Sequence, residues 1–313
     1  MKALKSSIVL KAASTVAIVL VLLVSSCKKD TELLNASDTQ NLNSEAVSDS
    51  YADEANDMAT IATSNVDDSQ FSGGRADGRT EGNGLVTPKI AWNLLDDRLK
   101  CATITIVRTN ALGATPAGTI TIDFGTGTCE DGRTIKRKGK IVVEYAGLRF
   151  ATGSTIKTTF VDYFRNGVKV EGVHTLTNVT PSNQAYPRFS ITIVGGKLTF
   201  ADGKIVTREQ SFIREWQRAT NPLEDKWVIL AGSSASGTNK AGKSYTMNVT
   251  KDLVYSRSCQ VSNRVFIAVS GTKVFVTDSR TYTVDYGNGD CDNDITVSVN
   301  GVSKTITVNA DGN

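Results

Sequence analysis

The amino-acid sequence predicts an all-β protein, built as an antiparallel meander of hairpins in a sandwich or an open, curved sheet. From about residue 90 onward, apolar and polar residues alternate in short runs such as Ile120-Thr121-Ile122-Asp123-Phe124. A period of two is typical of strands with one buried face. No helical pattern alternates with these runs, as a parallel sheet would require. The only helix expected is a short amphipathic one near the N-terminus.

Three dipeptides predict where the strands reverse. Asn166-Gly167, Asp202-Gly203 and Asn300-Gly301 each lie between two alternating runs. Asn-Gly and Asp-Gly adopt positive φ readily, which a two-residue hairpin turn requires. Consecutive hairpins of this kind build a meander.

The expected helix covers residues 44–64. Its apolar residues recur at helical spacing, with Ser44 or Asn43 as the N-cap. They are Val47, Tyr51, Ala55, Met58 and Ile61 or Ala62, and the polar face carries Glu45, Asp49, Asp53, Glu54 and Asp57. The pattern leaves two interpretations open. The helix either docks through its acids on a basic body or a partner, or simply covers one face or edge of a sheet.

The charges are distributed unevenly along the chain. Residues 30–74 contain ten Asp or Glu and no Lys or Arg, whereas residues 75–313 contain 30 basic and 22 acidic residues. The basic excess is spread along the strands, so a nucleic-acid partner is not expected. Residues 69–84 are rich in Gly, Asp and Arg and predict a linker. The expected organisation is an acidic tether at 27–84, with the helix, followed by a β-body at 85–313.

The N-terminus carries an export signal. An apolar run at 12–24 follows Lys2, Lys5 and Lys11. The run is too short to cross a bilayer as a stable helix but has the length of a signal-peptide core. Val24-Ser25-Ser26-Cys27 then resembles the cleavage box of bacterial lipoproteins. The alternative is an ordinary secretory signal with a coincidental cysteine. The resemblance implies that residues 1–26 are removed and that Cys27 is acylated, for example with palmitate, so that the mature chain is anchored to a membrane.

The residues after Cys27 bear on its destination. Lys28 follows the cysteine where an aspartate would mark retention in the inner membrane of such lipoproteins. Lys28, Lys29 and Asp30 also resemble tags that send some lipoproteins to the cell surface. The resemblance therefore implies the outer membrane, with the outer face slightly favoured over the periplasmic face.

Four cysteines remain once Cys27 is assigned to the lipid: Cys101, Cys129, Cys259 and Cys291. An even number in an oxidising compartment predicts two disulfides. The alternative pairings would close much longer loops than the local pairs Cys101–Cys129 and Cys259–Cys291. The loop-closure entropy of each local pair costs about 1.5 kcal/mol less. We therefore expect these two pairings.

An internal repeat supports the local pairing. Residues 121–129 (TIDFGTGTC) match residues 283–291 (TVDYGNGDC) in the same register. Each copy has a second cysteine upstream, so two related units are expected at about 97–180 and 252–308. With this repeat the β-body resembles uncharacterised outer-envelope lipoproteins, a resemblance that implies no activity.

The sequence offers weak ligand candidates. Oxygen-bearing side chains at alternate positions could bind calcium, although a solvated acidic turn is the simpler interpretation. They are Asn288, Asp290, Asp292 and Asp294. Trp216 and Trp227 could stack on sugar rings or lie in the core. The basic run Arg133, Lys136, Arg137, Lys138 and Lys140 suits an anionic glycan or lipid head group, or a solvated hairpin loop. No cofactor is expected.

Catalytic motifs are not recognisable. His174 is the only histidine and has no nucleophile-elbow pattern beside it, so we expect a half-exposed strand residue. Carboxylates that could hydrolyse glycosides in pairs are Glu144, Asp162, Glu171, Glu209 and Glu215. Three functions remain. The first is a lipid-anchored, non-catalytic binding or structural module with a glycan or envelope protein as partner. The others are a carrier of lipid or acyl chains and a polysaccharide-active enzyme.

Overall fold

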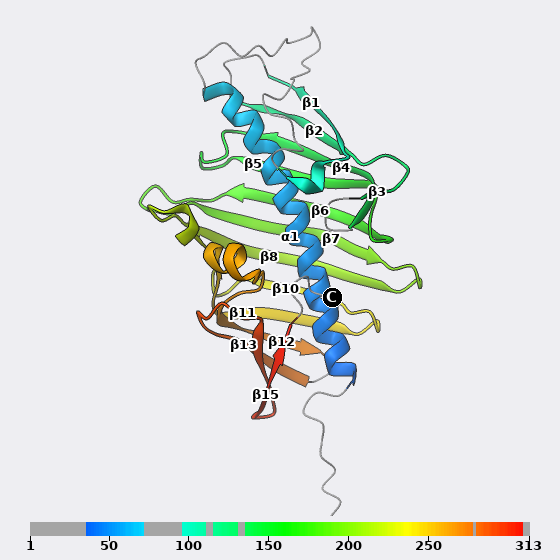
Figure 1. Cartoon of the computed structure of the whole chain (residues 1–313), viewed down its shortest axis with the longest axis vertical. Helices are drawn as coiled ribbons and strands as arrows, with labels where there is room; N and C mark the ends of the chain where they lie inside the picture. Colours follow the sequence, from blue (N-terminus) through cyan, green and yellow to red (C-terminus); the bar gives the residue numbers. More distant parts are fainter. Residues whose placement is uncertain (1–35, 72–95, 111–114, 131–134, 278–279, 309–313) are drawn as a thin grey trace, which may run out of the picture. The chain divides into compact units, whose positions relative to one another are not determined.

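A computed structural model describes residues 36–71, 96–110, 115–130, 135–277 and 280–308 of the 313-residue chain (Figure 1). The described residues belong to one compact unit. The predicted signal and the predicted acylation site Cys27 lie outside the described residues, as do residues 72–84 of the linker predicted at 69–84. The first three residues of that predicted linker belong to a helix instead.

The described residues form one long helix, three short helical turns and fifteen strands. The helical elements are α1 (Ala36–Phe71), η1 (Asp97–Leu99), η2 (Pro222–Glu224) and η3 (Cys259–Asn263). The first eight strands are β1 (Thr103–Arg108), β2 (Ala117–Asp123), β3 (Cys129–Glu130), β4 (Lys136–Ala146), β5 (Thr155–Arg165), β6 (Val168–Asn178), β7 (Arg188–Thr199) and β8 (Ile205–Gln217). The others are β9 (Lys226–Ile229), β10 (Ser234–Thr238), β11 (Ser244–Ser256), β12 (Ser270–Thr277), β13 (Arg280–Asn288), β14 (Asp294–Val299) and β15 (Val302–Thr307).

The strands form a single antiparallel sheet, which confirms the predicted fold class. Its order follows the sequence from β1 to β15, with only the short β3 and β9 off the main path. Two of the three predicted turns have the expected two-residue geometry. Asn166 and Gly167 join β5 to β6 with φ of 49° and 79°, and Asn300 and Gly301 join β14 to β15 with φ of 51° and 79°. Positive φ at both positions is the geometry of a type I′ turn. The third differs: Phe200 N donates to the Lys204 carbonyl oxygen, so the turn spans 201–203, and only Gly203 in it has positive φ.

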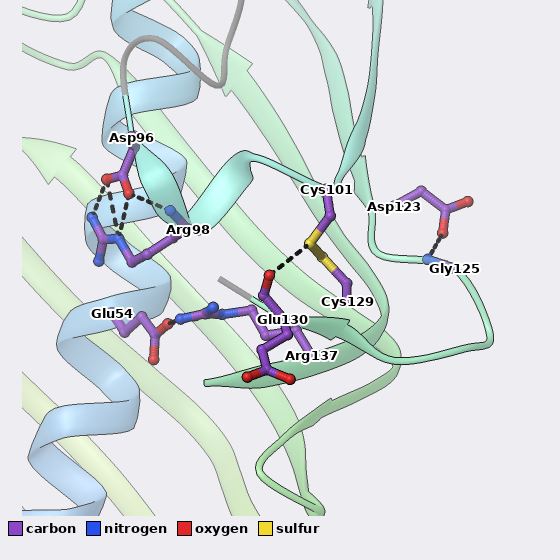
Figure 2. The surroundings of a disulfide bond; sticks show 9 residues. All are labelled: Glu54, Asp96, Arg98, Cys101, Asp123, Gly125, Cys129, Glu130 and Arg137. Carbon is purple, nitrogen blue, oxygen red and sulfur yellow. Dashed lines mark hydrogen bonds and ion pairs between the residues drawn. A yellow bond between two sulfur atoms is a disulfide. The ribbon is translucent and has the colours of Figure 1, made fainter. Parts of the chain in front are cut away.

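Both expected disulfides, Cys101–Cys129 and Cys259–Cys291, are present. The repeated motif has the same local structure in each unit. Asp123 Oδ1 accepts a hydrogen bond from Gly125 N at 2.8 Å (Figure 2), and Asp285 Oδ1 accepts one from Gly287 N at 2.8 Å. In each unit a cysteine precedes a hairpin, β1–β2 or β12–β13, and the motif leads back to the second cysteine.

Helix α1 is longer than the range predicted from sequence and lies across the strands of the sheet (Figure 1). Its buried side chains occupy more than half of its circumference when each residue is placed about 100° from the next. A surface helix buries a narrower stripe. Small buried residues such as Ala52, Ala55 and Ala59 allow the helix backbone to lie close to the sheet. The sheet and η1 therefore enclose the helix on several sides.

Two hydrophobic clusters lie along the sheet, and α1 contacts both. The first contains Met58 and Ala62 of α1 with apolar residues of β1 to β8, and the second contains residues from β9 to β14. Leu42 of α1 packs against the second cluster. The helix thus supplies core residues that one sheet face would otherwise lack.

Candidate functional site

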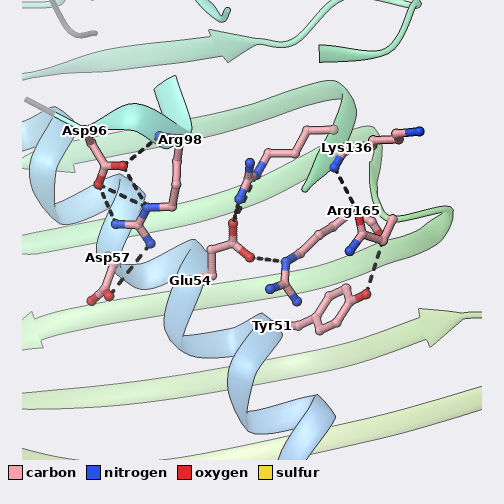
Figure 3. A network of polar contacts seen from close by, with 9 residues as sticks. Tyr51, Glu54, Asp57, Asp96, Arg98, Lys136 and Arg165 are labelled. Carbon is pink, nitrogen blue, oxygen red and sulfur yellow. Dashed lines mark hydrogen bonds and ion pairs between the residues drawn. The ribbon is translucent and has the colours of Figure 1, made fainter. Parts of the chain in front are cut away.

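Glu54 of α1 is buried between two arginines of the sheet. Arg137 Nε of β4 donates to Glu54 Oε1 at 3.0 Å (Figure 2). Arg165 Nε of β5 contacts the other carboxylate oxygen (Figure 3). The Arg165 guanidinium also lies over the Tyr51 ring, and Tyr51 Oη donates to the Arg165 carbonyl oxygen at 3.2 Å. One helix carboxylate thus contacts two guanidinium groups.

A second ion cluster lies nearer the start of α1. Lys273 Nζ of β12 donates to Glu45 Oε2 at 2.6 Å and lies 3.5 Å from Asp49 Oδ2. Arg208 of β8 pairs with Asp49 through Nη2, and its Nη1 lies 3.8 Å from Glu45 Oε1. Two carboxylates therefore face two cations. We call the cations that contact α1 carboxylates here, Arg137, Arg165, Arg208 and Lys273, the helix-binding cations.

For Lys273 and Asp49 of this cluster, burial and the neighbouring charges shift the pKa in opposite directions. Burial would lower the pKa of Lys273, but Glu45, Tyr286 and Asp49 outweigh it and hold that pKa well above its usual value. Burial would likewise raise the pKa of Asp49, but Arg208 and Lys273 hold it below the usual value. Burial and the neighbouring Asp49 raise the pKa of Glu45. The two cations therefore remain charged and keep Asp49 ionised beside them.

These ion pairs fix where the helix lies. Removing two charges from water costs about as much as their attraction returns, so buried pairs contribute little net stability over apolar residues. An unpaired buried charge is far worse. The partners of Glu45 lie on β8 and β12 and those of Glu54 on β4 and β5, so a helix shifted along the sheet would leave several charges unpaired. The ion pairs therefore specify one register for α1.

A third contact, about one turn after Glu54, is weaker. Asp57 Oδ2 lies 4.0 Å from Arg98 Nη1, and Arg98 is held by two hydrogen bonds from its side chain to Asp96 Oδ2, one of them 2.6 Å long (Figure 3). About half of the Asp57 side chain is exposed, so solvent screens this pair. The acids that the sequence placed on one polar face thus have different environments. Glu45 and Glu54 are buried, whereas Asp53 and Asp57 are exposed.

His174 lies under the helix and not at a half-exposed position, as the sequence predicted. It is 3% exposed and packs edge-on against Phe160 with the ring centroids 5.2 Å apart. Its Nδ1 has no hydrogen-bond partner in the described part of the chain. A cavity of about 20 Å³ beside it is also lined by Tyr51 and Arg208. Burial, with the nearby Arg208 charge, lowers the pKa of His174 to about 4.

This depressed pKa predicts a loss of stability in acid. Below pH 6.5 the unfolded chain binds a proton at His174, while the folded chain binds it only near pH 4. The free energy of unfolding therefore falls between pH 6.5 and about 4, by about 3 kcal/mol from this group. Denaturant titrations at pH 6.5 and pH 4 measure this fall in the free energy of unfolding. The fall should be about 3 kcal/mol smaller in His174→Leu than in the native protein. Equal losses in the two proteins would contradict the assigned environment.

The acidic turn of the second repeat unit forms a shallow depression of about 120 Å³. Its lining includes the calcium candidates Asn288, Asp290, Asp292 and Asp294. Asp292 Oδ1 accepts a hydrogen bond from Asp294 N at 3.0 Å, and Asp294 Oδ1 accepts one from the Thr307 hydroxyl. Among the described residues, no three His, Cys, Asp or Glu side chains are grouped as a metal site requires. The turn holds several of its acids through its own hydrogen bonds.

The carboxylates considered for glycoside hydrolysis contact basic groups or backbone instead of one another. Lys157 pairs with Glu144, Lys169 with both Asp162 and Glu171, and Arg188 with Glu215. Glu209 accepts a hydrogen bond from Gly195 N. Asp162 and Glu171 are the two that the structure brings to one cation, each 3.6 Å from Lys169.

The two candidate tryptophans lie side by side. Trp216 and Trp227 occupy paired positions on β8 and β9 and stack with centroids 5.0 Å apart. Phe150 approaches Trp216 at 5.8 Å, and Arg214 lies over the Trp227 ring at 4.3 Å. The sequence named both tryptophans but did not predict Phe150 or the arginines around them. We call Arg149, Phe150, Trp216, Arg218 and Trp227 the aromatic–arginine cluster.

The sequence also did not identify the helix-binding cations, because it treated the basic excess as spread along the strands. One signal was available. Arg137 is in phase with the buried Ile141 and Val143 of β4, and Lys273 is in phase with the buried Phe275 of β12. The basic run around Arg137 is part of a strand and not the hairpin loop expected as the simpler interpretation. Its lysines are exposed, and Arg133 lies outside the described residues.

Across the described ranges, no helix has an apolar stretch of the length needed to span a bilayer. Comparison with known proteins adds no relative. No family model, curated protein or solved structure matches this chain, and its function is therefore inferred from the residues and contacts described above.

Proposed function

We propose that the chain is a lipid-anchored, non-catalytic binding or structural module of the cell envelope. One observation carries this proposal. Two disulfides use four of the five cysteines, and the remaining one is Cys27, directly after a short apolar run with lysines at its start. Disulfides persist in oxidising compartments outside the cytosol. The cysteine pairing and the apolar run thus both favour export, and Cys27 is placed where a lipid would be attached.

The arrangement of α1 supports a module without a catalytic centre. A carrier of acyl chains needs an apolar face with nothing in it, and here α1 packs against that face. A polysaccharide hydrolase needs two carboxylates facing a sugar, and the candidate acids contact lysines, an arginine or a backbone amide. Neither alternative is favoured by a specific contact, so the binding or structural role remains our proposal.

Replacement of Cys27 tests the anchor. Cells of the native host are grown with an alkyne analogue of palmitate, and the full chain is compared with Cys27→Ala. We expect the native protein to carry the label and to enter the detergent phase on extraction. The variant should carry no label and stay in the aqueous phase, because myristoyl-length or longer chains supply most of the membrane affinity. An unlabelled native protein, or mass spectrometry finding an unacylated mature N-terminus, would refute the proposal.

We also propose that the protein lies on the outer face of the outer membrane, because Lys28, Lys29 and Asp30 resemble tags for export to the cell surface. Protease added to intact cells should then degrade the lipidated protein, and a periplasmic marker in the same cells should survive. Protection of the protein until the outer membrane is permeabilised would assign it to the periplasmic face and leave the lipid anchor intact.

A further inference from the structure

The aromatic–arginine cluster is a row of contacting rings and guanidinium groups with one half-buried and one exposed end. At the half-buried end Trp227 stacks on Trp216, and Arg214, which lies outside the cluster as defined, covers the Trp227 ring. Its exposed end is Phe150, which lies in the loop between β4 and β5 and is 50% exposed. The Trp216 indole is fixed in place, because its Nε1 donates to Asp225 Oδ2 at 3.0 Å. The exposed ring therefore lies on a rigid support.

Two guanidinium groups lie at the exposed end. The Arg149 guanidinium lies 5.2 Å from the Phe150 centroid, and the Arg218 guanidinium lies 6.0 Å from it and 5.5 Å from the Trp216 centroid. Asp225 is buried and accepts hydrogen bonds from Trp216 Nε1 and Ala219 N. No ion pair to Arg218 is found in the ranges that the structure describes. Arg218 is exposed and can pair with an anion from solution.

Arginine and large aromatic residues have distinct uses at binding surfaces. They dominate the energetic centres of protein interfaces, where rigid rings supply contact area at little entropic cost. A guanidinium binds a carboxylate through two parallel hydrogen bonds, which a lysine cannot do. At this exposed end, the ring and the guanidinium groups lie 5 to 6 Å apart. A ligand that contacts both the ring and a guanidinium group would have a flat apolar face and a negative charge separated by about the width of one sugar ring.

We propose that the exposed end of the aromatic–arginine cluster, formed by Phe150, Arg149 and Arg218, binds an anionic glycan. The C–H face of a sugar ring lies on Phe150, and the carboxylate of the same or the next sugar pairs with Arg218. A polyuronate repeats ring and charge together in every unit, whereas an acidic peptide carries its charges on flexible chains without rings. The proposal names the ligand of the binding module proposed above and rests on that function.

Titration of the full chain in detergent with polygalacturonate tests this site. Intrinsic tryptophan fluorescence, to which Trp92, Trp216 and Trp227 all contribute, and calorimetry report binding. Dextran is the neutral polymer and poly-glutamate the acidic peptide. We expect polygalacturonate to bind, dextran not to bind, and poly-glutamate to bind at least tenfold more weakly. Equal affinity for poly-glutamate would overturn the glycan assignment, and the absence of binding to polygalacturonate would overturn the site.

Two variants test whether polygalacturonate binds at the exposed end of the aromatic–arginine cluster. Arg218→Gln and Phe150→Ala change exposed side chains and should each weaken polygalacturonate binding about tenfold, the size expected for a central contact. Lys304→Gln removes the same charge on β15, the last strand of the sheet order, and should bind as the native protein does. Equal binding by all four proteins would refute the assignment, provided that their thermal melts coincide.

The lipid anchor is measured on the same preparation by mass spectrometry. A chain that is acylated at Cys27 but does not bind polygalacturonate would refute the glycan site alone. A chain that binds but is not acylated would refute the anchor alone. The two proposals therefore fail separately.

Discussion

Replacing Glu54 with glutamine is expected to lower the free energy of unfolding by about 3 to 5 kcal/mol, the loss found when one partner of a buried ion pair is removed. Glutamine has nearly the same shape as glutamate, so packing is preserved and only the charge is lost. Arg137, at 2% exposure, and Arg165 would then lack their carboxylate. Urea titration of both proteins measures the difference directly.

Asp53→Asn is the matched control for this experiment. It changes the same type of charge on the same helix at an exposed position one residue away. Its effect should stay within about 0.5 kcal/mol, as for most surface substitutions. If Glu54→Gln were as mild as Asp53→Asn, Glu54 could not be buried between two arginines.

A triple replacement separates charge pairing from packing. Exchanging Glu54, Arg137 and Arg165 together for leucine or methionine removes every charge in the triad. Such replacements are often neutral or stabilising, because no ion has to be desolvated. We therefore expect the triple variant to be more stable than Glu54→Gln. A triple variant less stable than the single one would mean that these side chains contribute chiefly by shape.

Removing the disulfide of the second repeat unit, by replacing Cys259 and Cys291 with alanine, should lower the free energy of unfolding by about 3.7 kcal/mol. The chain-entropy relation gives this value for a loop closed over a separation of 32 residues. The first disulfide closes 28 residues and should contribute nearly as much. Urea titration of the double variant tests the value, and Cys27→Ala serves as the control that leaves both bridges intact.

Thiol counting gives an independent check of the same pairing. Native protein unfolded without a reductant should react with a maleimide at neither Cys259 nor Cys291, and peptide mapping should find them linked to each other. Labelling of all four body cysteines, or a Cys101–Cys259 peptide, would contradict the assigned bridges.

The sequence predicted the sheet well because its signals are local. Alternation within a strand and Asn-Gly between strands each need only a few neighbouring residues, and Asn166-Gly167 forms the turn that its residue types favour. The two disulfides were also predictable, since the repeated motif assigned one cysteine pair to each unit. These features fix the order of the strands, which is the sequence order.

The helix position and the clusters depend on residues far apart in the chain. Glu45 and Lys273 are 228 residues apart, and a helical pattern cannot state which strand its acids will contact. Of the two interpretations left open for the helix, docking through its acids on a basic body agrees with Glu45 and Glu54, which contact cations of the sheet. Phe150 joins Trp216 through a loop between β4 and β5, and local sequence carries no signal for such a contact.

The claim on which the others depend is that α1 is part of the folded core and is held by its paired acids. Native-state hydrogen exchange measures this without any substitution. Amides at residues 48–63 should open with a free energy close to that of global unfolding, together with the amides of β4 and β8. Exchange of these helix amides through a separate opening, with a free energy near zero while the strands remain protected, would contradict the account.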